Sequence, residues 1–173
     1  MRTYRSAVFV MVAFGLSTLS ARAQDGKAVE VMPYVALGSS GTSPVGTAII
    51  FPVTSTLSVE TDVAYRRGEG RIHALSTNTS LLWFLPRIGQ STPYLAGGIG
   101  LSQYGAPIFS IDGPPIGTES RVAVTVNAGG GLKMPVKEKL GLRTDVRWFK
   151  SFRQGESEQF RVSQGLSFDV GKR

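Results

Sequence analysis

The chain has 173 residues and no cysteine. This length suits a single domain, and neither a disulfide framework nor a lipid-anchored N-terminal cysteine can form. Its 19 lysine and arginine residues exceed its 12 aspartate and glutamate residues, so the formal net charge is +7. The basic residues are spread along the chain, whereas a nucleic-acid-binding surface needs a concentrated basic face. The charge therefore excludes no compartment and gives no reason to expect a nucleic-acid partner.

The first 23 residues have the pattern of a secretory signal peptide. Two arginines precede a largely apolar run over residues 7–19, and Ala21–Ala23 is an A-x-A cleavage site. The apolar run is shorter than the roughly 20 residues that cross a bilayer as a helix. We therefore predict a cleaved signal peptide at 1–23 and one mature domain at 24–173. Three arginines leave with the signal, so 16 basic residues remain against 12 acidic ones, a net charge of +4.

Eight segments of the mature domain alternate apolar and polar side chains, and this period of two is typical of a β-strand. In Leu57–Arg66 the alternation is clearest, because Leu57, Val59 and Val63 face away from Glu60 and Asp62. The predicted strands are Val29–Leu37, Val45–Val53, Leu57–Arg66, Arg71–Leu85, Tyr94–Tyr104, two strands within Ser120–Phe152 that are joined by a turn at Pro135–Lys139, and Gln159–Val170.

The connections between these segments alternate in length. The connections at 54–56, 86–93 and 135–139 fall on the side of the chain termini, and the longest connection, Ala106–Glu119, falls on the other side. Membrane barrels have short periplasmic turns and longer extracellular loops. Although the four-residue connection Arg67–Gly70 does not fit this rule, the pattern favours an even number of strands with both termini periplasmic.

The composition of the polar face predicts that it points inward. It consists mostly of Gly, Ala, Ser, Thr and Asn, and of six lysines in the mature domain only Lys133 lies clearly within a strand. A face in water would carry more long charged side chains, whereas small residues suit the narrow lumen of an eight-stranded barrel. Charges in such a lumen must be paired. We predict a lumen charge network of Glu30, Glu60, Asp62, Arg66, Arg121, Lys133, Arg143, Asp145, Arg147, Arg161 and Asp169.

The apolar face is then expected to contact lipid. Aromatic residues gather towards the strand ends, as the interfacial girdles of a membrane barrel require. Alternation alone would also fit a soluble barrel with the apolar face inside, so a soluble periplasmic ligand-binding barrel is an alternative. The predicted girdle residues are Phe51, Tyr65, Trp83, Trp148 and Phe168.

The sequence offers little that predicts catalysis. His73 is the one histidine, and the nearest serine, Ser76, is three residues away, so in an unbroken strand the two side chains point to opposite faces. The glycine clusters at 97–100 and 129–131 do not match a phosphate-binding loop and are expected to permit tight curvature. No histidine or cysteine accompanies the carboxylates, so we predict no metal site. Because His73 and Ser76 do not share a face, we predict no enzymatic activity, and we predict no cofactor.

Three stretches resemble the small bacterial outer-membrane β-barrel family, the OmpA-like and opacity-type barrels. They are PYLAGGIGLSQYG (93–105), NAGGGLKMPVKEKLGLRTDVRWF (127–149) and GLSFDV (165–170). The resemblance implies an all-β fold, an eight-stranded antiparallel up-and-down transmembrane barrel in the outer membrane.

The resemblance also implies a structural or surface-interaction, adhesin-like role. The expected partners are outer-membrane lipid and a host or cell-surface partner that contacts the extracellular loops, and the small-molecule ligand is unknown. Alternatives are a minimal porin-like pore, a lipid-A-modifying hydrolase and the soluble barrel. The loop residues expected to make a surface contact are Phe109, Ile111 and Ile116.

Overall fold

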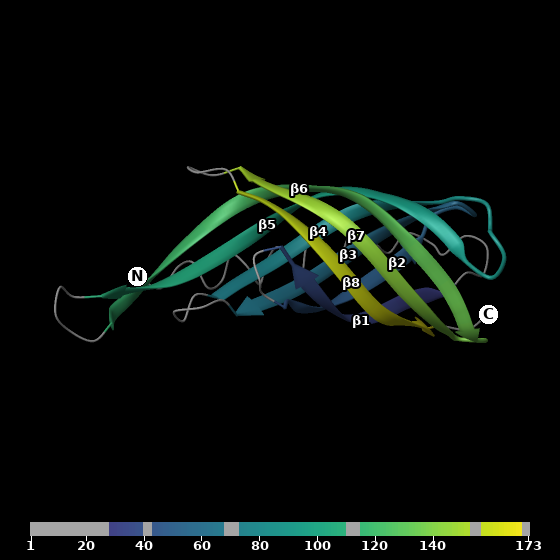
Figure 1. Cartoon of the computed structure of the whole chain (residues 1–173), viewed down its shortest axis with the longest axis horizontal. Coiled ribbons are helices and arrows are strands. Elements are labelled where there is room, and N and C mark those ends of the chain that lie inside the picture. The colour runs from purple at the N-terminus through teal and green to yellow at the C-terminus, as the bar shows by residue number, and fades with distance from the viewer. Residues whose placement is uncertain (1–27, 40–42, 68–72, 110–114, 153–156, 171–173) are drawn as a thin grey trace.

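The computed structural model describes residues 28–39, 43–67, 73–109, 115–152 and 157–170, with only the backbone for 106–109 and 115–119. The predicted signal peptide lies outside these residues and stays a prediction. Eight strands form (Figure 1): β1 Val29–Gly38, β2 Val45–Pro52, β3 Leu57–Arg67, β4 His73–Phe84, β5 Thr92–Phe109, β6 Pro115–Lys137, β7 Leu140–Phe152 and β8 Ser157–Val170.

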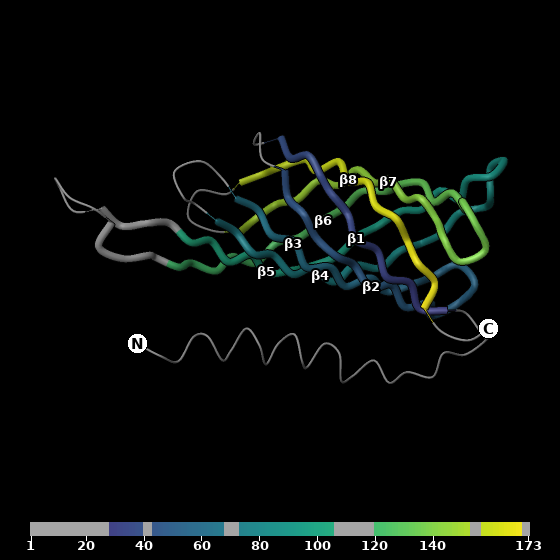
Figure 2. The backbone as a smooth tube through the Cα atoms, turned by 90° about the horizontal axis from the view of Figure 1, so that it is seen from below, coloured from purple at the N-terminus to yellow at the C-terminus, as the bar shows by residue number. Residues whose placement is uncertain are grey.

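The strands close into a barrel in chain order, and each strand is antiparallel to its neighbours. Closure is made by β1 and β8, which pair from Val29 opposite Val170 to Gly38 opposite Arg161 and lie side by side in Figure 2. The predicted eight-stranded up-and-down barrel is confirmed. Because β1 begins where β8 ends, both termini of the described barrel lie at the same end.

Two short turns at this end fix the register of their hairpins. In the β2–β3 turn, the Thr54 hydroxyl accepts hydrogen bonds from the N–H groups of Thr56 (3.2 Å) and Leu57 (2.9 Å). In the β4–β5 turn, the N–H groups of Ile88 and Ser91 each donate to the other's carbonyl, and Gly89 between them has φ +61°. Glycine adopts this left-handed conformation without steric cost, so it suits the turn.

The predicted loop Ala106–Glu119 is largely strand. β5 continues to Phe109 and β6 begins at Pro115, with register pairs from Ala106 opposite Glu119 to Phe109 opposite Pro115. The alternation had ended the two strands earlier, and pairing across the hairpin extends into the predicted loop with a register shift between Ile108 and Phe109.

The predicted turn Pro135–Lys139 is also shorter than expected. β6 runs to Lys137, and a register shift between Pro135 and Lys137 accommodates the proline. Only Glu138 and Lys139 remain between β6 and β7.

The barrel is apolar outside and polar inside, as the composition of the polar face predicted. Its buried positions include charged residues such as Glu60 (2% exposed) and Arg147 (1% exposed). A soluble protein shows the reverse distribution. Large apolar residues on the outer surface include Val35, Val63, Leu81, Trp83, Leu95, Ile99, Val124, Val146, Phe160, Val162, Leu166 and Phe168.

Aromatic side chains lie towards both ends of the outer wall. Tyr65 and Phe160 are exposed near one end, and Trp83 and Phe168 are exposed near the other. The outward belt between them is mainly aliphatic, which is the arrangement of a barrel with two membrane interfaces. Among the described residues, no helix is long and apolar enough to cross a membrane.

We expect Val146→Arg to prevent barrel assembly in lipid. Val146 is exposed, lies at the middle of β7 and pairs with Gly130 and Val162. An arginine at mid-membrane depth costs about 2–4 kcal/mol. Gel mobility of boiled and unboiled protein measures assembly, because a closed barrel resists detergent until it is heated. Val53→Arg, in the exposed β2–β3 turn, is the control and should assemble normally. Assembly of both variants would contradict the lipid-facing assignment.

Candidate functional site in the barrel lumen

A cluster of six charged residues fills the centre of the lumen. Its members are at most 5% exposed, and the three carboxylates match the three guanidinium groups in charge. Alternation along three strands directs every one of these side chains inward. The members are Glu60 and Asp62 on β3, Arg143, Asp145 and Arg147 on β7, and Arg161 on β8. We call this set the central charge cluster.

Glu60 joins two opposite walls of the barrel. One carboxylate oxygen lies 2.6 Å from Nη1 of Arg143, and the other accepts a hydrogen bond of 2.6 Å from Nη2 of Arg147. In an eight-stranded ring, β3 and β7 are four strands apart on either side. The two ion pairs therefore cross the full width of the lumen.

Asp145 ties the same arginines to two further strands. Its Oδ2 lies 3.4 Å from Arg147 and 3.6 Å from Arg143, and it accepts a hydrogen bond of 3.0 Å from the Tyr94 hydroxyl on β5. Its Oδ1 accepts a hydrogen bond of 2.6 Å from Ser163 on β8. Nε of Arg143 donates to the Tyr94 oxygen at 2.7 Å. Each carboxylate oxygen of Asp145 thus has a donor.

Asp62 forms the second half of the cluster. Its Oδ1 accepts a hydrogen bond from the Tyr34 hydroxyl (3.0 Å) and lies 3.7 Å from Nη1 of Arg161. The side-chain amide of Asn78 donates to both carboxylate oxygens at 3.3 and 3.2 Å. The Arg161 guanidinium lies 4.4 Å from the centre of the Phe149 ring, a distance typical of a cation–π contact.

Inward glycines make room for the two tyrosines. A Cβ atom at Gly46 would lie 2.6 Å from Cζ and the hydroxyl oxygen of Tyr34, and one at Gly131 would collide with the Tyr94 hydroxyl. A side chain at either position would push the phenol away from its carboxylate. The glycine cluster at 129–131 therefore permits close approach within the strands, and the sequence analysis did not anticipate this role.

The other residues of the predicted charge network lie apart from the cluster. Lys133 and Glu30 form an ion pair with each other, and Arg66 donates a hydrogen bond of 2.9 Å to Gln159. Asp169 lies at the mouth of the barrel. Arg121 has the inward parity of β6 but is exposed, because β6 extends beyond its neighbour β7 at this height, and its membership of the charge network stays a prediction.

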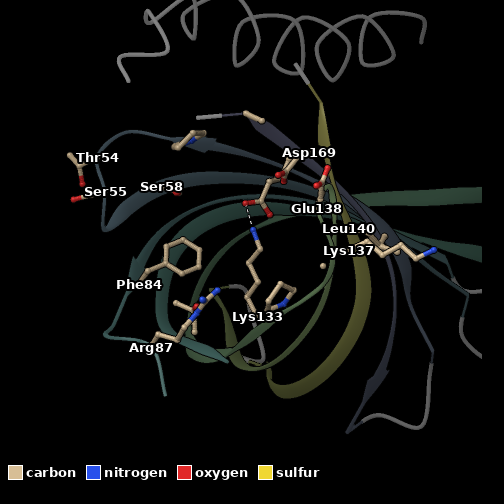
Figure 3. Close-up of a pocket in the computed structure, with 16 residues that line it drawn as sticks. Thr54, Ser55, Ser58, Phe84, Arg87, Lys133, Lys137, Glu138, Leu140 and Asp169 are labelled. Atoms are coloured by element: carbon tan, nitrogen blue, oxygen red, sulfur yellow. Dashed lines mark hydrogen bonds and ion pairs between the residues drawn. The ribbon is translucent and has the colours of Figure 1, made fainter. Parts of the chain in front are cut away.

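The mouth at the end that holds both termini contains a cavity of about 450 Å³. Figure 3 shows Lys133 reaching across it, with its ion pair to Glu30 drawn as a dashed line. Lys137, Glu138 and Asp169 also line the cavity. Phe84 also lines the cavity and packs against the buried apolar cluster that includes Leu82 and Tyr94.

Among the described residues, the other candidate site residues do not come together in one site. His73 is exposed, and the hydroxyl of Ser76 lies on the opposite face of β4 and donates to the Ala64 carbonyl at 3.4 Å. No group of three or more metal-ligating side chains occurs among the described residues. Phe109 and Ile116 lie in backbone-paired parts of β5 and β6, but their side chains and the whole of Ile111 are outside the described set.

The structure adds members that the sequence analysis did not single out. Tyr34, Asn78, Tyr94 and Ser163 all bind a carboxylate of the central charge cluster. Their inward parity was visible in the alternation. A large phenol on a face of small residues was the available signal that each tyrosine reaches across the lumen.

No protein-family model matches the chain, and no curated protein sequence does so either. Solved structures share its fold. The N-terminal β-barrel domain of Pseudomonas aeruginosa OprF has a TM-score of 0.62 and 16% identity, covering 84% of this chain and 98% of that one. Neisserial surface protein A has a TM-score of 0.62 and 11% identity, covering 82% of this chain and 94% of that one. The outer membrane enzyme PagL has a TM-score of 0.52 and 16% identity, covering 82% of this chain and 99% of that one. The predicted resemblance to small outer-membrane barrels is therefore confirmed for the fold.

We expect Glu60→Gln to destabilise the folded barrel by about 3–5 kcal/mol, because Arg143 and Arg147 would lose their shared buried counter-charge. Chemical denaturation in lipid vesicles measures the change in unfolding free energy. The matched control is Glu158→Gln: Glu158 lies 3.5 Å from Lys150, with 55% of its side chain exposed, and should cost about 0–1 kcal/mol. Equal effects of the two substitutions would show that the lumen pairs contribute no special stability.

Proposed function

We propose that the chain is an outer-membrane barrel with a structural and surface-interaction role, and that it presents the β5–β6 hairpin outside the cell as its contact element. Both termini are then periplasmic, and the mouth cavity opens to the periplasm. The filled lumen makes the barrel a rigid support for the hairpin.

The observation that carries this proposal is the projection of the hairpin beyond its neighbours (Figure 1). Pairing of β4 with β5 ends at Gly105, and pairing of β7 with β6 begins only at Val124. Between these limits, residues 106–109 and 115–123 pair across the hairpin and with no other described strand. No other described strand therefore pairs with the backbone N–H and C=O groups on the two outer edges of the hairpin.

A free strand edge recognises an extended segment of another protein. Such a segment adds as a further strand, and main-chain hydrogen bonds supply affinity while side chains supply specificity. At the base of the hairpin, Arg121 and Val122 are exposed and offer a positive charge and an apolar contact. These features fit a cell-surface protein with an exposed extended segment.

The non-enzymatic part of the proposal depends on the residues of this chain. The solved neighbours include both a surface protein and an enzyme, so the fold favours neither role. A hydrolase with a serine nucleophile needs its base within hydrogen-bond reach of that serine. His73 and Ser76 lie on opposite faces of β4, and this supports a role without hydrolysis.

A minimal pore is the second candidate, because the mouth cavity admits solvent to one end of the lumen. The central charge cluster opposes this function, since its side chains bridge β3 and β7. We expect vesicles that contain the folded chain to show no swelling in isosmotic small sugars, as for empty vesicles. Swelling at a rate comparable to that of a general porin would contradict a closed lumen.

We expect the hairpin to be needed for adhesion but not for assembly. A variant that replaces residues 107–118 with Asn-Gly joins Ala106 to Glu119, a register pair, through a two-residue hairpin turn. Displayed on a laboratory Gram-negative strain, it should adhere to an epithelial monolayer at a clearly lower level than the unmodified chain and should keep heat-modifiable gel mobility.

The control is Ile88→Ser, which removes a 72% exposed apolar side chain at the opposite end and should adhere like the unmodified chain. Undiminished adherence of the shortened variant would contradict the proposal. So would adherence of the unmodified chain no greater than that of the strain without it.

A further inference from the structure

The outward face of β8 carries an amide at the centre of its apolar belt. Gln164 is exposed and lies four residues from Phe160 and four residues from Phe168, which are both exposed. At about 3.3 Å per residue, each aromatic lies roughly 13 Å away along the tilted strand. The outward apolar band of membrane barrels is about 25 Å tall. Gln164 therefore lies at mid-depth in the hydrocarbon if the outward face meets lipid, on which this inference rests.

Its surroundings in the barrel wall are mainly apolar. Gln164 pairs with Val35 on β1 and Thr144 on β7, and Val162 and Leu166 flank it on β8 with 46% and 43% exposure. No hydrogen bond reaches its side chain from any described residue. A carboxamide has two N–H donors and an oxygen acceptor, and hydrocarbon satisfies none of them.

Two pairs of outward polar side chains bond within the chain. The hydroxyl groups of Thr61 and Thr79 lie 3.5 Å apart, and the Gln103 amide donates to Ser120 at 2.8 Å near the hairpin. Gln164 differs from them because no described side chain bonds to its amide.

A second irregularity lies beside Gln164. The N–H of Ser39 donates to the Phe160 carbonyl of β8. In an antiparallel pair, every second residue of β1 directs its backbone nitrogen to β8 in the same way. The nitrogen of Pro33 therefore faces the carbonyl of Leu166. Proline has no N–H to donate, and the β1–β8 register pairs accordingly lapse between Val31 and Tyr34. A backbone carbonyl without its ladder partner thus lies two residues from Gln164, in a region where lipid offers no donor.

We propose that two copies of this barrel associate in the membrane through the outward face of β8, with the two Gln164 carboxamides hydrogen-bonded across a two-fold axis. A carboxamide is self-complementary, and a two-fold contact places the same patch on both subunits. Apolar surfaces gain little by leaving lipid for each other, so association in a membrane depends on close packing and hydrogen bonds. The aliphatic residues between Phe160 and Phe168 allow that close approach.

Cysteine cross-linking in outer membranes locates the contact, because the chain has no cysteine of its own. We expect Val162→Cys and Leu166→Cys to form cross-linked dimers with a short thiol-reactive reagent. Leu81→Cys is the control: Leu81 is 51% exposed on β4, on the opposite side of the ring. Cross-linking at β8 no greater than at Leu81→Cys would overturn the proposal.

Energy transfer between labelled copies of the full mature domain in phosphatidylcholine vesicles tests the amide itself. Gln164→Leu should weaken association about tenfold, equivalent to about 1.4 kcal/mol, and Thr79→Val on β4 should leave it unchanged. Heat-modifiable gel mobility of each variant separates a failure of association from a failure of the barrel. Unchanged association of a folded Gln164→Leu barrel would overturn the proposal. A Gln164→Leu barrel that is less stable as a monomer but associates normally would also overturn the proposal. The amide would then serve as a donor to the Leu166 carbonyl of its own barrel.

Discussion

The interior of this barrel depends on the ion pairs that Glu60 makes with Arg143 and Arg147 across the lumen. Closure satisfies the backbone of the wall, but it leaves a narrow space lined by polar side chains that solvent scarcely reaches. In that space each charge needs a counter-charge and hydrogen bonds. Glu60 on β3 meets both arginines of β7, so the network holds opposite walls together in the way that an apolar core does in a soluble protein.

Because polar side chains fill the lumen, the surfaces that we propose for interaction lie outside it. The centre of the interior is occupied by buried side chains of the chain itself. Among the described residues, the projecting β5–β6 hairpin at one end and the outward face of the wall are accessible. The two surfaces would bind by different interactions. A strand edge offers backbone hydrogen bonds to a partner in water. An amide at mid-depth hydrogen-bonds to another amide because lipid offers it no partner.

The two proposed contacts are compatible in one molecule. The hairpin edges belong to β5 and β6 beyond Gly105 and before Val124, and Gln164 lies in the middle of β8, two strands away around the ring. A pair of barrels joined at β8 would therefore carry two hairpins, and linked binding sites can exceed the affinity of either one.

The alternation in the sequence by itself determined the number of strands and which side chains share a face, because a period of two fixes sidedness without knowledge of the neighbours. The small residues on the polar face then indicated which face points inward. The sequence could not determine which charges meet. Glu60 and Asp62 look equivalent in sequence, yet the barrel's stagger brings Glu60 to two arginines of β7 and Asp62 to Arg161, Tyr34 and Asn78. Tertiary structure also decided that Arg121 is exposed and that the proline-rich loop is paired strand, since both depend on how far β6 outruns β7.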